Sequence, residues 1–160
     1  MAYPTVDAPY GLIPVKTLSG APMTGAIRQY RIASGYATAI FKGDAVKLVT
    51  GGTVERDAFD AAMTPIGVFL GCAYTDSVSG FIHRNSYPAS TAASDIVAYV
   101  ADAEDLLFKV AIVSGTTVIG DMAITDIGAN VAGVLTGASF TGLISSVAVL
   151  LILSVPSLMV

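Results

Sequence analysis

Side chains suited to catalysis are scarce in this 160-residue chain, which has one His, one Cys and no Trp. Nucleophilic catalysis requires a base beside the nucleophile, and His83 is the only imidazole available for that role. Because His83 stands in the strand-like run FIHR, a surface or hydrogen-bonded structural role is expected. The segment GASFTG, residues 137–142, is not a nucleophile elbow, since Thr141 stands where the second glycine belongs. No catalytic residue is predicted.

Thiol and metal chemistry is equally thin. Cys72 lies in the apolar run VFLGCAY, which predicts a buried, inert thiol, and a lone Cys excludes an intramolecular disulfide. One His and one Cys cannot form a zinc site within one chain. The segment DAED contains Asp102, Glu104 and Asp105 but lacks the EF-hand pattern. We therefore expect a solvated acidic turn, and a calcium site between subunits is the less favoured alternative. We therefore expect no metal, no cofactor and no enzymatic activity.

The composition indicates partners. Hydrophobic residues make up 54% of the chain and charged residues only 12%, against roughly 25% charged residues in an average soluble protein. The length suits one domain. Charged residues are too few to cover the surface of a free monomer, and exposed apolar patches usually mark interaction sites. We expect the chain to cover itself with partner subunits.

Charge is unevenly distributed along the chain. Residues 1–56 hold six basic and three acidic residues, whereas residues 57–160 hold two basic and nine acidic residues. The electropositive first part suits docking onto an acidic surface, unless folding mixes the two parts in space. Nucleic acid is not predicted as a partner, because the basic residues are scattered singly without stacking aromatics beside them.

The first 27 residues predict an extended arm. Prolines at positions 4, 9, 14 and 22 and glycines at positions 11, 20 and 25 keep this segment out of a helix. Such an arm has little core of its own, so it is expected to become ordered on the parent domain or on a neighbouring subunit. The segment lacks the basic and apolar regions of a signal peptide.

Residues 28–160 predict a single all-β domain, either a β-barrel or a β-sandwich. Short runs rich in Val, Ile, Tyr, Phe and Thr alternate there with Gly, Asp and Ser turns. Candidate strands are residues 28–33, 37–41, 45–49, 53–56, 66–74, 81–84, 96–100, 107–113 and 147–153. Segments 58–63 and 100–107 are each expected to allow one helical turn.

The stretch IFKGDAVKLVTGGTVERD, residues 40–57, predicts two short strands around tight turns. Gly43 permits the first turn and Asp44 is expected to accept backbone N–H groups there. The glycine pair at 51–52 supplies the positive φ that a hairpin turn needs. Between the turns, alternation is expected to point Ala45 inward and Val46 to the opposite face.

The carboxyl end is very apolar, with no charged residue between positions 127 and 160. Its last 18 residues, LISSVAVLLILSVPSLMV, have the length of a membrane span. However, Ser and Pro interrupt the run, and no Lys, Arg, Trp or Tyr flanks it, so a membrane anchor is not expected. The apolar core of the run suits a buried strand. The residues predicted to contact neighbouring subunits are Val147, Val149, Leu151 and Leu153.

Five segments occur in this order between Tyr10 and Gly142: YGLIPVKTLSGAPMTGAIRQYRIASGYATAIFKGDAVKL, PIGVFLGCAY, VAYVADAEDLLFKV, DIGAN and GASFTG. The resemblance that these segments carry is to the head decoration, or capsid cement, proteins of tailed bacteriophages. It implies a β-barrel or β-sandwich with an extended arm, made in the host cytoplasm and placed on the outside of the virion capsid. Two departures are the DAED segment, where the family has a DDP-like turn, and the very apolar carboxyl end.

The resemblance implies two kinds of partner: the major capsid protein, and further copies of the chain as a homo-oligomer such as a trimer or as lattice neighbours. The residues predicted to contact the capsid are Tyr3, Tyr10, Leu12, Ile13, Lys16, Arg28 and Arg31. Alternatives remain open: a tail or neck component, a non-catalytic oligomeric binding module, a carrier of the lipoyl or biotinyl kind, and a hydrolase that depends on His83.

Overall fold

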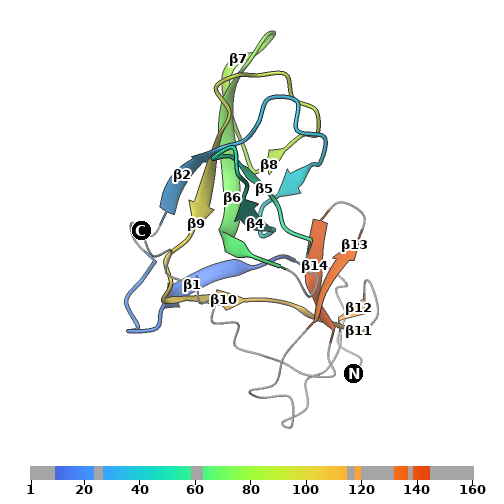
Figure 1. Cartoon of the computed structure of the whole chain (residues 1–160). Coiled ribbons are helices and arrows are strands. Elements are labelled where there is room, and N and C mark those ends of the chain that lie inside the picture. The colour runs from blue at the N-terminus through green and yellow to red at the C-terminus, as the bar shows by residue number, and fades with distance from the viewer. Residues whose placement is uncertain are drawn as a thin grey trace.

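The structure, a computed structural model, describes residues 10–23, 27–58, 63–114, 118–119, 132–136 and 139–144. Every regular element within these residues is a β-strand, so the protein is all-β (Figure 1). The candidate strand at 147–153, with Val147, Val149, Leu151 and Leu153, lies outside the described residues, as does Tyr3.

The largest unit is an antiparallel sheet organised by β6. Its strands are β2 (Ile27–Arg31), β4 (Ala45–Leu48), β5 (Val54–Arg56), β6 (Pro65–Asp76), β7 (Gly80–Arg84) and β9 (Val97–Ala101). The order is β2-β9-β6-β4-β5, and β7 also pairs with β6. β6 is 12 residues long. Because of this length, its first part can pair with β4 and its second part with β7, while β9 pairs along its other edge.

Three smaller sheets surround this unit. One pairs β1 (Ile13–Thr17) with β10 (Leu106–Lys109), and another pairs β3 (Ile40–Phe41) with β8 (Ser86–Tyr87). The third has the order β12 (Val118–Ile119), β11 (Ile112–Ser114), β14 (Ser139–Ile144) and β13 (Ala132–Thr136). In Figure 1 the β1–β10 ribbon crosses the lower end of the central sheet.

The sheets are not closed into a barrel within the described residues. The edge strand β2 meets the segment before β5 through a single isolated bridge between Arg31 and Thr53. One bridge is not a continuous hydrogen-bonded ladder, which barrel closure requires. The predicted all-β class is therefore confirmed, whereas barrel closure is not found in this part of the chain.

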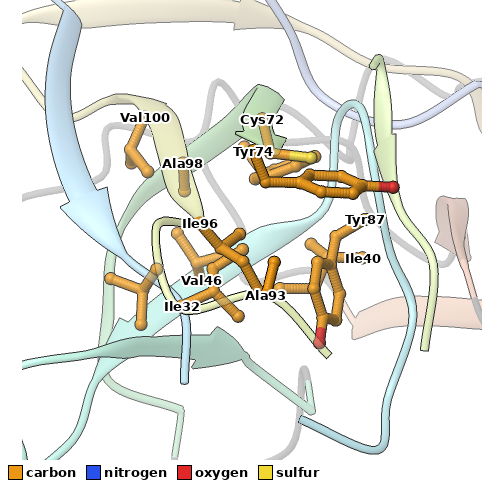
Figure 2. Close-up of a cluster of buried hydrophobic side chains, with 12 residues drawn as sticks. Ile32, Ile40, Val46, Cys72, Tyr74, Tyr87, Ala93, Ile96, Ala98 and Val100 are labelled. Carbon is orange, nitrogen blue, oxygen red and sulfur yellow. The ribbon is translucent and has the colours of Figure 1, made fainter. Parts of the chain in front are cut away.

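The core lies on one face of the central sheet (Figure 2). Its buried side chains are Ile32, Ile40, Val46, Val54, Phe69, Cys72, Tyr74, Tyr87, Ala93, Ile96, Ala98 and Val100. The Tyr87 ring packs 6.1 Å from the ring of Tyr36, and its hydroxyl donates to the Tyr36 carbonyl at 3.0 Å. A buried phenol needs such a partner, because an unpaired hydroxyl in an apolar core is costly.

The turn predicted at KGD is confirmed. Gly43 has φ +95°, a conformation that other residues rarely adopt. Asp44 is buried, and its Oδ2 accepts the backbone N–H of Phe41 at 2.8 Å. Gly52 likewise has positive φ at the turn between β4 and β5, as the glycine pair predicted.

Two local predictions are wrong. Ala45 and Val46 are both fully buried, so β4 does not have one inward and one outward face at its start. Val46 packs into the core cluster, so the core covers the face that the sequence pattern assigned outward. The segment 100–107 contains no helical turn: β9 ends at Ala101 and β10 begins at Leu106, with only a tight turn between them.

Candidate interaction surface

The amino-terminal segment from residue 10 packs on its own domain. The Leu12 side chain is 1% exposed, and its backbone N–H donates to the Gly43 carbonyl at 2.9 Å. Gly11 crosses Gly43 so closely that the two backbones nearly touch. β1 then pairs antiparallel with β10, from Ile13 opposite Lys109 onward. Leu12, predicted to contact a capsid, is therefore occupied within its own subunit.

The outer side of this segment carries three exposed apolar side chains, which we call the β1 strip: Ile13 (41% exposed), Val15 (51%) and Leu18 (60%). Val15 has no partner in the β10 register, which shifts between Pro14 and Lys16, and such a bulge increases the local twist. Lys16 is also exposed. The segment thus combines an anchored inner side with an apolar outer side.

Tyr10, another predicted capsid contact, is half-buried at the start of the segment. The Lys109 ammonium lies 5.6 Å from the centre of its ring, within the range of a cation–π interaction. Because Lys109 belongs to β10, this contact adds a second attachment of the segment to the domain.

Arg28 and Arg31 lie on the edge strand β2 but make internal contacts. The Arg28 guanidinium is 3.4 Å from the Asp102 carboxylate; the arginine side chain is 75% exposed and the aspartate side chain 5%. The Tyr30 hydroxyl donates to the same carboxylate at 2.7 Å. Burial, and then the hydrogen bond and charge of Asp102, raise the pKa of Tyr30. Arg31 Nη2 donates to the Ser94 carbonyl at 2.9 Å.

Folding therefore mixes charges at this end of β2. Arg28 and Asp102 line a pocket of about 490 Å³ together with Glu104 and Asp105. The acidic DAED segment thus lies beside one of the basic residues of the first part of the chain. The charge distribution along the sequence predicted an electropositive surface, but at Arg28 this surface also contains acidic side chains.

His83 stands in a row of aromatic rings on the face of the sheet opposite the core. Its ring contacts Phe81 edge to face at 5.0 Å and stacks on Tyr99 at 6.0 Å with an interplanar angle of 21°. In the described part of the chain, the His83 side chain makes these two ring contacts. The alternation in FIHR places Phe81 and His83 on one face. Tyr99 could not be found from sequence, because it depends on the register between β6 and β9.

Cys72 is buried, as predicted, and its Sγ lies 3.5 Å from the Ser86 carbonyl. Burial raises the pKa of the thiol to about 11. The thiol is therefore protonated at neutral pH, and a protonated thiol is a poor nucleophile.

Across the described ranges, no three His, Cys, Asp or Glu side chains converge as metal ligands would. The described part of the chain also has no helix with the length and apolar character needed to cross a membrane.

Comparison with known proteins gives no further guide, since no protein-family model, no curated protein and no solved structure matches the chain.

Proposed function

We propose that the chain is a non-catalytic structural protein of a bacteriophage head, a decoration protein that binds the capsid exterior and braces neighbouring major capsid subunits. The observation that carries the proposal is the β1 strip, three large apolar side chains exposed on β1 and directly after it, on a segment that its own domain holds in place. Grouped exposed apolar residues usually mark a contact with another protein. The sequence resemblance supplies the class of that protein.

The proposed architecture is a sandwich-like β-domain, residues 28–160, with residues 1–27 as the arm. In this arrangement Leu12 and the Gly11–Gly43 crossing fix the arm on its own domain. Ile13, Val15 and Lys16 then face the capsid from a fixed position. Pre-positioning lowers the ordering cost of binding, and repetition over a lattice multiplies weak contacts. Further copies of the chain, as a homo-oligomer or as lattice neighbours, would cover other apolar surface.

The first test is whether the chain is present in particles and in how many copies. Phage particles are purified from a host that carries the gene, and the chain is quantified against the major capsid protein by mass spectrometry. Hundreds of copies per particle are expected of a head protein. A dozen or fewer would place the chain in a tail or neck, and absence from particles would contradict the proposal.

The second test asks whether the β1 strip is the contact surface. Val15→Asp is expected to weaken retention on purified heads more than about tenfold, because the new charge would be buried without a partner. Val78→Asp is the matched control, since Val78 is also exposed but lies in the turn between β6 and β7. Circular dichroism verifies folding of both variants. Equal retention of the two folded variants would mean that the β1 strip does not face the capsid.

A further inference from the structure

A second pocket lies away from the surfaces described above. It has a volume of about 390 Å³ and is bounded by the β6–β7 ribbon and by the loop that follows β8. Tyr74 and Arg84 line it from the ribbon, and Thr91 lines it from the loop. Tyr74 and Arg84 reach the same side of the sheet because Tyr74 and its neighbour Cys72 pair with Ile82 and Arg84 on β7.

The two strongest hydrogen-bond donors of this pocket have no partner in the part of the chain that the structure describes. Arg84 is exposed and forms no ion pair or hydrogen bond with these residues, although its charge helps to lower the pKa of the Asp76 carboxyl; the Tyr74 hydroxyl forms no hydrogen bond with them either. The Tyr74 side chain is only 3% exposed, yet no buried side-chain oxygen here lacks a partner. Its hydroxyl oxygen therefore keeps some contact with solvent, and Figure 2 shows it at the end of the ring, away from the centre of the core cluster. Unpaired donors beside a pocket favour an acceptor as ligand.

The charge of the pocket limits which acceptor fits. Asp76 also lines it, and its Oδ2 accepts the backbone N–H groups of Ser79 at 2.9 Å and Val78 at 3.2 Å. The Ser79 and Val78 bonds hold the pKa of this carboxyl below its usual range, so it is ionised at neutral pH. With one guanidinium and one carboxylate, the pocket has little net charge. A dianion such as phosphate is disfavoured, whereas a singly charged, planar carboxylate matches the guanidinium fork.

The opposite wall of the pocket is held in a fixed conformation. The Ser90 N–H donates to the Tyr36 carbonyl at 2.7 Å, and the Thr91 hydroxyl donates to the Pro88 carbonyl, also at 2.7 Å. Ser90 has φ +60°, an uncommon conformation for a residue other than glycine. Backbone of this kind persists only where its surroundings hold it, and it often occurs at binding sites.

We propose that this pocket binds a carboxylate group, with Arg84 as the ionic partner and the Tyr74 hydroxyl as a second donor. The carboxylate belongs either to a free organic acid or to an acidic side chain of a protein. The inference does not depend on the proposed role in a phage head, because it rests on different residues on a different part of the domain.

The test is an NMR titration that follows the backbone amides of Thr75, Ser77 and Thr91. Four probes are compared: sodium propionate, its neutral isostere propionamide, inorganic phosphate, and a blocked Gly-Glu-Gly peptide. Propionate is expected to bind saturably in the millimolar range, and propionamide and phosphate are expected to bind more weakly. Tighter binding of the peptide than of propionate would assign the site to a protein side chain, and the reverse order would assign it to a free acid.

Variants decide whether the named residues do the binding. Arg84→Gln is expected to weaken propionate binding at least about tenfold, and Tyr74→Phe about three- to tenfold. Arg31→Gln, the same charge change outside the pocket, should leave the affinity within about twofold. If Arg84→Gln does not fold, Arg84→Lys must weaken binding, because a lysine lacks the planar fork. Tighter binding of phosphate, equal binding of propionamide, no shifts with propionate, or unchanged binding in the folded Arg84 variant would overturn the proposal.

Discussion

Replacing Gly11 by alanine tests how the amino-terminal segment is attached. A Cβ at position 11 would lie 2.7 Å from the Gly43 carbonyl oxygen and 2.8 Å from its Cα. These neighbours are backbone atoms, so no flexible side chain can move aside to make room. We expect the Gly11→Ala chain to lift the segment off the Gly43 turn while the central sheet stays folded.

Lifting the segment would remove two contributions to stability, the burial of the Leu12 side chain and the backbone hydrogen bond that Leu12 donates. Burial of a Leu side chain such as Leu12 is worth about 1.5–3 kcal/mol, and a net backbone hydrogen bond about 0.5–1.5 kcal/mol. The free energy of unfolding should therefore fall by about 2–4.5 kcal/mol, the sum of these two contributions. For a chain of this size, each kcal/mol corresponds to a melting temperature lower by about 2–4 °C.

Urea unfolding followed by circular dichroism measures this loss, with two other glycine variants as comparisons. Gly51→Ala is the control, since its nearest neighbour would be the Thr53 hydroxyl at 4.0 Å. Gly43→Ala should be the most destabilised, because φ +95° adds a cost of about 1–2 kcal/mol to the same clash. If Gly11→Ala were as stable as Gly51→Ala, the close crossing of the two backbones would be refuted.

Three further predictions concern titrating groups. Because the pKa of Tyr30 is raised, the stability that this group contributes should be complete below its unfolded pKa of 10.0 and should be lost as the pH rises through the higher folded pKa. Tyr30→Phe removes the titrating group, so its urea midpoint should fall less at alkaline pH than the midpoint of the unmodified chain. The Thr75 hydrogen bonds are the largest cause of the lowered pKa of Asp95, so Thr75→Val should raise it in a ¹³C NMR titration, and an unchanged value would contradict the bond. Native Cys72 should react with a thiol reagent at pH 8 at least about tenfold more slowly than the urea-unfolded chain; equal rates would show an accessible thiol.

Local signals in the sequence were sufficient for many elements. Gly35, Gly43, Gly52 and Gly80 all have positive φ, and each lies at a turn that the sequence indicated by composition. The strands between them follow because β-branched and aromatic runs bounded by turns have few alternatives. The predicted strand 107–113 was instead divided into β10 and β11, which belong to different sheets.

Long-range pairing could not be predicted in the same way. The arm was expected to be extended, but nothing in IPVKT identifies β10 as its partner. The same holds for the carboxylate pocket, where Tyr74 and Arg84 become neighbours only through the β6–β7 register. The pairing of Tyr30 with Asp102 likewise depends on how β2 lies beside β9. These features depend on register, which is set by the burial of whole faces and not by any single segment.

The pairing of β1 with β10 has a consequence for biosynthesis. Ile13 lies opposite Lys109, so β1 has no partner for this pair of its ladder until residue 109 has been made. Translation proceeds at about 5–20 residues per second, which leaves β1 without its ladder partner for several seconds. A chain cut short before β10 would never form this ribbon. Under the proposed function, incomplete translation products would therefore be excluded from the lattice because they cannot present the binding strand in its folded geometry.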